Sequence, residues 1–129
     1  MKQSIAHIAL IVKDYDEAIK FYTEKLNFIL IEDTVLNEEK RWVLVKPKGA
    51  AGCCLLLTKA VNERQKISVG NQSGWRVFLF LHTGNFKRDY QNLIDKNIKI
   101  VQEPKTEKYG TVAVFEDLYG NLWDLIERL

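Results

Sequence analysis

The sequence is poor in the residues that cross-link or break a chain. It has only two cysteines and two prolines among 129 residues. The cysteines are the neighbours Cys53 and Cys54, and neighbours in a strand point to opposite faces and rarely bridge each other. A chain of this length can bury a core without such staples. Nothing in the cysteine usage calls for an oxidising compartment, so we expect a cytoplasmic location.

Long apolar runs and an excess of one charge are also missing. The longest apolar runs, such as Val77 to Leu81, are far too short to span a bilayer, and residues 1–4 show no signal-peptide pattern. The chain has 19 basic and 17 acidic residues, scattered along its length, so no basic face for nucleic acid stands out. We therefore expect neither a membrane nor a nucleic acid as partner.

The sequence predicts the same order of helices and strands twice along the chain. Asp14 and Asn85 are typical helix N-caps, and the apolar spacing after them predicts helices over 15–26 and 86–96. Asn27 and Asn97 are expected to end these helices in the left-handed conformation. The strands are predicted, in chain order, at 5–12, 28–35, 41–45, 53–57, 76–81, 98–102, 110–116 and 122–126. The first and fifth of these read as buried strands.

These elements predict an α+β fold made of two βαβββ modules in one domain, residues 1–129. The first module covers about 1–59, a polar loop follows at 60–74, and the second module covers about 75–129. The polar stretch Thr58 to Gly74 reads as a linker or mobile loop, and Lys46 to Gly52 as a turn. Two units predict a pseudo-symmetric pair that closes one cupped, mixed sheet, because a solenoid needs at least three repeats. The rival topology, a pair of ferredoxin-like units, would need a second helix in each module.

Two polar residues stand at unusual places in the predicted strands. His7 shares a face with Ala9 and Ile11, and Asp124 shares a face with Leu122 and Ile126. A buried ionised carboxylate is costly unless it is paired or bound to a metal. His7 and Asp124 are therefore candidate ligand or metal contacts. The alternative is a core histidine bonded to a backbone carbonyl, with Asp124 pairing it or Arg76.

Longer runs of sequence carry a family resemblance. The opening run His7–Asp14, then Ala18, Phe21-Tyr22 and Leu26-Asn27-Phe28, and the closing runs Tyr109-Gly110 and Phe115–Leu125, resemble the vicinal oxygen chelate superfamily. This superfamily includes glyoxalase I, bleomycin-binding proteins and extradiol dioxygenases. The resemblance covers essentially the whole chain and implies the fold above and a homodimer. Its enzymes use a divalent metal in the cup to hold two adjacent substrate oxygens, but the fold alone leaves the reaction open.

The metal pattern of that superfamily is only half present. His7 matches the histidine of the first strand, and Asp124 stands where the superfamily normally has glutamate, four residues after Gly120. In the second module the position that matches His7 is Phe78, seven residues before Asn85. In the first module the position that matches Asp124 is Leu56, four residues after Gly52. Neither can bind a metal, and a catalytic site normally keeps three protein ligands.

The resemblance leaves two main hypotheses. In the first, His7 and Asp124 hold Mn, Fe, Zn or Ni in a metal-dependent lyase, isomerase or dioxygenase. In the second, no cofactor is bound, and the protein binds or sequesters a small organic molecule in an aromatic cup. The residues expected to line the substrate site are Phe78, Phe80, Tyr109, Trp75 and Trp123. A third, weaker hypothesis is a protein–protein interaction module.

Overall fold

A computed structural model describes residues 2–49 and 52–129, so the predicted turn at Lys46–Gly52 lies partly outside the described residues. The chain divides into two compact units, Met1–Ser68 and Val69–Leu129. The division falls inside the predicted polar loop. Each unit holds one four-stranded mixed sheet and at least one helix, so the predicted α+β fold with two βαβββ modules is confirmed.

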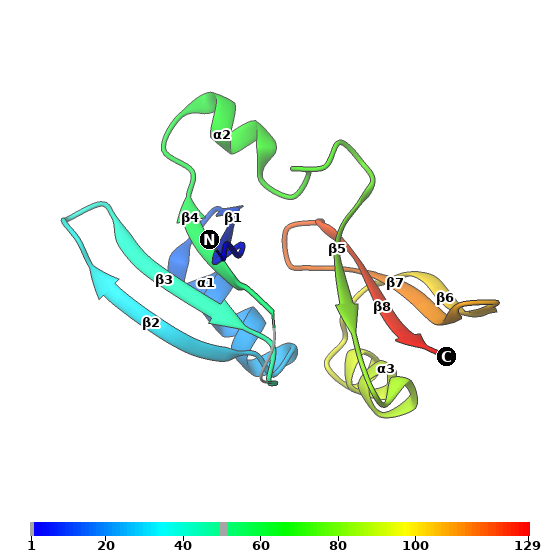
Figure 1. Cartoon of the computed structure of the whole chain (residues 1–129). Coiled ribbons are helices and arrows are strands. Elements are labelled where there is room, and N and C mark those ends of the chain that lie inside the picture. The colour runs from blue at the N-terminus through cyan, green and yellow to red at the C-terminus, as the bar shows by residue number, and fades with distance from the viewer. Residues whose placement is uncertain (1, 50–51) are drawn as a thin grey trace. The chain divides into compact units, whose positions relative to one another are not determined.

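The sheet of the first unit has the strand order β1-β4-β3-β2 (Figure 1). Strand β1 runs parallel to β4, and the other neighbours are antiparallel. The elements of this unit are β1 (His7–Val12), α1 (Tyr15–Lys20), the π-helical turn η1 (Phe21–Lys25), β2 (Ile29–Val35), β3 (Arg41–Lys46), β4 (Cys54–Lys59) and α2 (Glu63–Ser68).

The first helix begins and ends where its sequence predicts. The side chain of Asp14 accepts a hydrogen bond of 2.8 Å from the backbone N–H of Glu17, which satisfies one of the free donors at the helix start. After Lys20 the helix widens into η1, and Asn27 then takes a left-handed φ of 61°. The predicted helix is thus present, but its second half is π-helical.

The core of the first unit lies between the sheet and α1–η1. Alternate strand residues point to this side and are buried: Leu10, Val12, Val43, Val45, Leu55 and Leu57. They meet Ala18, Phe21 and Tyr22, the buried residues of the helical segment. Strand β1 begins at His7, not Ile5, and only one of its faces is fully buried, so the prediction of a strand buried on both faces is wrong.

The second unit repeats this plan. Its sheet has the order β5-β8-β7-β6, with β5 parallel to β8. The side chain of Asn85 caps α3 by accepting from the N–H of Arg88 at 3.1 Å, and Asn97 has a φ of 58°. The core gathers Ala113, Phe115, Trp123 and Leu125 with Leu93 of α3. The elements are β5 (Val77–His82), α3 (Phe86–Asp95), β6 (Ile100–Glu107), β7 (Gly110–Glu116) and β8 (Leu122–Arg128).

Three predicted segments differ from the structure. Part of the predicted loop is a helix, α2, whose first turn is stabilised by the side chain of Asn62 accepting from the N–H of Gln65 at 2.9 Å. Strand β6 is longer than predicted and runs through Pro104, which is tolerated because β6 is an edge strand with register shifts on both sides of Gln102. Strand β5 is half-exposed along most of its length, not buried.

The side of each sheet that faces away from the buried core is called its open face below. On the first unit it carries His7, Ala9, Ile11, Glu32, Thr34, Trp42, Leu44, Lys46, Cys54, Leu56 and Thr58. On the second unit it carries Val77, Phe80, His82, Gln102, Lys105, Val112, Val114, Glu116, Leu122, Asp124 and Ile126. Leu44 on the first face, and Val112, Val114 and Ile126 on the second, are nevertheless buried. Within the described residues, no helix has the length and apolarity needed to cross a membrane.

Candidate functional site

The strand registers show which open-face positions are equivalent in the two units. In the first unit Leu56 pairs with Ala9 on one side and Leu44 on the other. In the second unit Asp124 pairs with Phe80 and Val114. Ala9 and Phe80 each stand five residues before the helix cap of their unit. Asp124 and Leu56 therefore occupy the same position in two copies of one structure.

His7 lies at the start of β1, exposed within its unit, and its imidazole ring meets Trp42. The two ring centroids are 5.9 Å apart at an interplanar angle of 77°, an edge-to-face contact. Strand β4 lies between β1 and β3, so this contact spans the open-face side chains of β4. Trp42 thus joins His7 as part of one aromatic surface. Sequence reasoning did not single out Trp42, although its parity with Leu44 places it on this face.

Strand β2 adds a carboxylate and a hydroxyl to the same open face. A register shift between Leu30 and Glu32 brings Glu32 opposite Leu44 and Thr34 opposite Trp42. The hydroxyl of Thr34 donates a 3.0 Å hydrogen bond to the Glu32 carboxylate. Sequence reasoning missed both residues because a bulge of one residue reverses the faces of a strand, and this bulge has no sequence signal.

Asp124 is the polar centre of the open face of the second unit. It is half-buried, and its carboxylate has no hydrogen bond or ion pair with any other described residue. Burial raises the pKa of its carboxyl group, because the charged form loses water. Its neighbour in register, Phe80, is 61% exposed. The unit therefore presents an accessible phenyl ring directly beside a poorly solvated carboxylate.

The other residues predicted for the substrate site are dispersed. Phe78 lies at a register shift between Val77 and Leu79, close to Phe80 in the same strand. Trp75 precedes β5 and is 81% exposed. Tyr109 lies in the β6–β7 turn, which is at one end of β7, whereas Val114, the partner of Asp124, lies towards the other end. Trp123 is 3% exposed and stacks on Phe115, with centroids 5.9 Å apart. It points to the core side of the sheet, away from Asp124.

The donor groups do not fit the divalent metal that the superfamily's enzymes use. Of the four repeated positions, only His7 and Asp124 carry donor atoms, because Phe78 and Leu56 are hydrocarbon side chains. Cys54 pairs in register with His7, whereas Glu32, the third donor on this open face, lies on β2, the opposite edge strand from His7. Across residues 2–49 and 52–129, no three His, Cys, Asp or Glu side chains form a group that could hold a metal ion. A metal centre with three protein ligands is therefore not built into the described residues.

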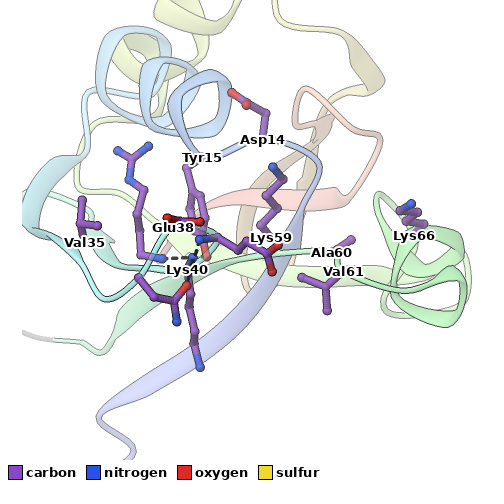
Figure 2. Close-up of a pocket in the computed structure, with 12 residues that line it drawn as sticks. Asp14, Tyr15, Val35, Glu38, Lys40, Lys59, Ala60, Val61 and Lys66 are labelled. Carbon is purple, nitrogen blue, oxygen red and sulfur yellow. Dashed lines mark hydrogen bonds between the residues drawn. The ribbon is translucent and has the colours of Figure 1, made fainter.

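A pocket of about 610 Å³ lies at the edge of the first unit, where β1 leads into α1, β4 ends and the β2–β3 hairpin turns (Figure 2). None of the predicted site residues lines it. Three lysines, Lys40, Lys59 and Lys66, are balanced by three acids, Asp14, Glu38 and Glu39. The pocket therefore favours neither anions nor cations.

Arg41 also borders this pocket, but its charge is already satisfied. Its guanidinium donates to both oxygens of Asp33 at 3.1 and 2.7 Å and to Asp16 at 2.9 Å, and it lies 5.2 Å from the centre of the Tyr15 ring. The hydrogen bond with Asp33, more than that with Asp16, raises the pKa of Arg41 above its usual range. This group ties the β2–β3 hairpin to α1 and serves the fold.

Known proteins match the chain over nearly its whole length. A relative from Shewanella frigidimarina (strain NCIMB 400), described as an uncharacterized protein, is 59% identical over 128 residues, 98% of this chain and 95% of its own. The crystal structure of UcmS2 is similar at 31% identity and a TM-score of 0.84, covering 98% of each chain. That of TnmS3, an antibiotic binding protein from Streptomyces sp. CB03234, is similar at 27% identity and a TM-score of 0.81, covering 100% of this chain and 99% of that one.

A family model also matches the chain. It is that of the glyoxalase/bleomycin resistance protein/dioxygenase superfamily, and it matches residues 4–125. The chain belongs to this superfamily.

Proposed function

We propose that the protein binds a small aromatic molecule on its open faces without a metal ion. The observation that carries this proposal is the pair of aromatic side chains on the open faces, the half-buried Trp42 in the first unit and Phe80, which is 61% exposed, in the second. The ring of Trp42 meets His7 over β4, and Phe80 lies beside Asp124. Large aromatic rings contribute much of the binding energy in small-molecule sites.

The small number of metal-binding side chains supports metal-independent binding. Each module supplies only one donor at the repeated positions, His7 in the first module and Asp124 in the second. TnmS3, whose structure is similar at 27% identity, is described as an antibiotic binding protein, which agrees with a binding function. We further propose that the chain works in the cytoplasm as a homodimer, in keeping with the family resemblance.

The proposed binding residues are His7 and Trp42 on the open face of the first unit and Phe80 and Asp124 on that of the second. Phe78 and Trp75 lie close to Phe80 in the chain. Trp123 is left out because it points to the core side of β8, and Tyr109 because it lies at the far end of β7.

The experiment is an equilibrium titration with a fluorescent aromatic probe, anthracen-9-ylmethanol, followed by anisotropy. Phe80→Ala is expected to raise the Kd about tenfold, equivalent to about 1.4 kcal/mol. The matched control is Phe86→Ala, which removes the same ring from α3, where Phe86 stacks on Tyr90. The control should leave the Kd within about twofold of the wild type. Equal losses in the two variants, or no binding by the wild-type protein, would refute the proposed site.

A metal-dependent lyase, isomerase or dioxygenase is the second candidate. It is favoured by one observation, the half-buried Asp124 without a protein partner, since such a carboxylate suits a hard cation. Elemental analysis of protein purified without chelator separates the two candidates. About one divalent ion per chain, lost in both His7→Ala and Asp124→Ala, would favour the enzyme.

A further inference from the structure

We infer that the ligand is an aromatic ring system that carries a protonated amine, which the open faces recognise by a ring and a carboxylate side by side. The inference rests on the proposed function and names the chemical class of its ligand. Its basis is that each unit builds this pair independently, Trp42 with Glu32 in the first and Phe80 with Asp124 in the second.

In the first unit the pair stands on neighbouring strands. Thr34 is opposite Trp42, and Glu32 is opposite Leu44, so Glu32 and Trp42 are diagonal neighbours. Such neighbours lie roughly 7–8 Å apart at the backbone, within reach of long side chains. The hydrogen bond from Thr34 fixes the Glu32 carboxylate on this face. Tryptophan is the best aromatic partner for a cation, so an ammonium group between indole and carboxylate would be held by both.

In the second unit the pair stands in direct register. Phe80 and Asp124 are partners in parallel strands, whose spacing is about 4.8 Å. Asp124 is half-buried, yet its carboxylate has no hydrogen bond or ion pair with any described residue. A carboxylate that has lost water without gaining a protein partner is costly, and a cationic or donating group of a ligand would offset this cost.

The basic residues on the open faces do not reverse this preference. Lys46 is opposite Ile29 in the first unit, one row further from Trp42 than the row of Leu44 and Glu32. In the second unit Lys105 forms an ion pair of 3.2 Å with Glu107. Glu32 has no ion pair with any described residue. Glu32 thus lies nearer to Trp42 than Lys46 does, and the charge of Lys105 is balanced by Glu107.

Three probes with one ring system and different charges test the inference: anthracen-9-ylmethylamine, anthracen-9-ylmethanol and anthracene-9-carboxylate. The wild-type protein is expected to bind the amine about tenfold more tightly than the carboxylate, with the alcohol between them. Glu32→Gln and Asp124→Asn should each lower the ratio of the carboxylate's Kd to the amine's Kd about threefold or more. The Kd of the alcohol should change less than about twofold. The controls are Glu24→Gln on η1 and Asp95→Asn on α3, which remove a carboxylate elsewhere and should leave the ratio unchanged.

The outcomes separate this inference from the proposed function. If the three probes bind with equal Kd, if the carboxylate binds most tightly, or if neither variant narrows the ratio, the cationic ligand class is wrong while aromatic binding stands. If no probe binds, the proposed function itself fails.

Discussion

The two units share one backbone plan but differ in what they place on its open face. At equivalent positions on the central strands, Leu56 in the first unit corresponds to Asp124 in the second. The next strand carries Trp42 in the first unit, where the second has Val112, which is opposite Ile126. In the first unit the carboxylate, Glu32, is therefore on an edge strand and the large ring, Trp42, on an inner strand. In the second unit the carboxylate, Asp124, is on an inner strand and the ring, Phe80, on an edge strand.

This difference shows which parts of a duplicated fold are free to change. The core sides of both sheets carry leucines at the same places, Leu10 with Leu57 and Leu81 with Leu125. Packing against a helix restricts these positions to apolar residues. The open faces differ at matching positions, Leu56 against Asp124 and Ala9 against Phe80, so these positions are less restricted.

The largest expected effect compares Leu10 with Leu81. Leu10 is fully buried, whereas Leu81 is half-buried. Leu10→Ala should lower the free energy of unfolding by about 2–5 kcal/mol, because it leaves a cavity, and Leu81→Ala should cost clearly less. Urea denaturation measures both. Equal costs would mean that the second unit is covered at Leu81 by something outside its own core.

Exchanging the central residues of the two sheets should have the next largest effect. Leu56→Asp puts a carboxylate without a partner on a half-buried site and should destabilise the protein by about 1–3 kcal/mol. Asp124→Leu removes such a group and should stabilise it by up to about 1 kcal/mol, while weakening binding of the amine probe. Thermal unfolding and probe titration are the measurements. A less stable Asp124→Leu variant would show that Asp124 serves the fold and not a ligand.

The aromatic surface of the first unit is tested by Trp42→Leu. The substitution keeps an apolar residue next to Leu44 but removes the ring that meets His7, so anthracen-9-ylmethanol should bind about five- to tenfold more weakly. Stability should change less than in Leu10→Ala, because Trp42 is only half-buried. An unchanged Kd would confine the ligand to the second unit.

The smallest effect concerns a helix position that carries a charged residue in the second unit and an alanine in the first. Asp89 in α3 corresponds to Ala18 in α1, each four residues after its helix cap. Burial raises the pKa of Asp89, but hydrogen bonds from Arg88 and Thr83 outweigh it and the net pKa is lowered. The folded state therefore favours the ionised form, and this stabilisation is present at neutral pH and lost as the pH falls through the folded pKa. Asp89→Ala should flatten the acid side of the stability profile, measured by urea denaturation between about pH 2 and 7. A profile identical to the wild type would contradict this role.

The sequence predicted the fold well because its signals are local. Helix caps at Asp14 and Asn85, and left-handed ends at Asn27 and Asn97, each depend on a few neighbouring residues, and all four are present. Helix α2 was not predicted because its six residues include a single apolar residue, Ile67, and therefore show no apolar period. The pair Asn62 and Gln65 was a capping signal that could have revealed it.

The candidate site was less predictable because it depends on register between strands. Parity within one strand placed Asp124 on one face with Leu122 and Ile126, and the registers put these three residues on the open face. The pairing of Asp124 with Phe80 comes from the register between two strands. Glu32 could not be found in this way, because the register shift after Leu30 decides which face it joins. Trp123 was expected to contact a ligand, but as the immediate neighbour of Asp124 it points to the other side of β8.

The measurement that tests the central claim most directly is the binding of anthracen-9-ylmethanol to chelator-treated protein, repeated after adding Mn, Fe, Ni or Zn. The account predicts that the metal-free protein binds the probe and that the Kd stays the same within about twofold after each addition, because the described residues supply rings and not a three-ligand metal centre. Binding that appears only after a metal is added, and that is lost in His7→Ala and Asp124→Ala, would contradict it.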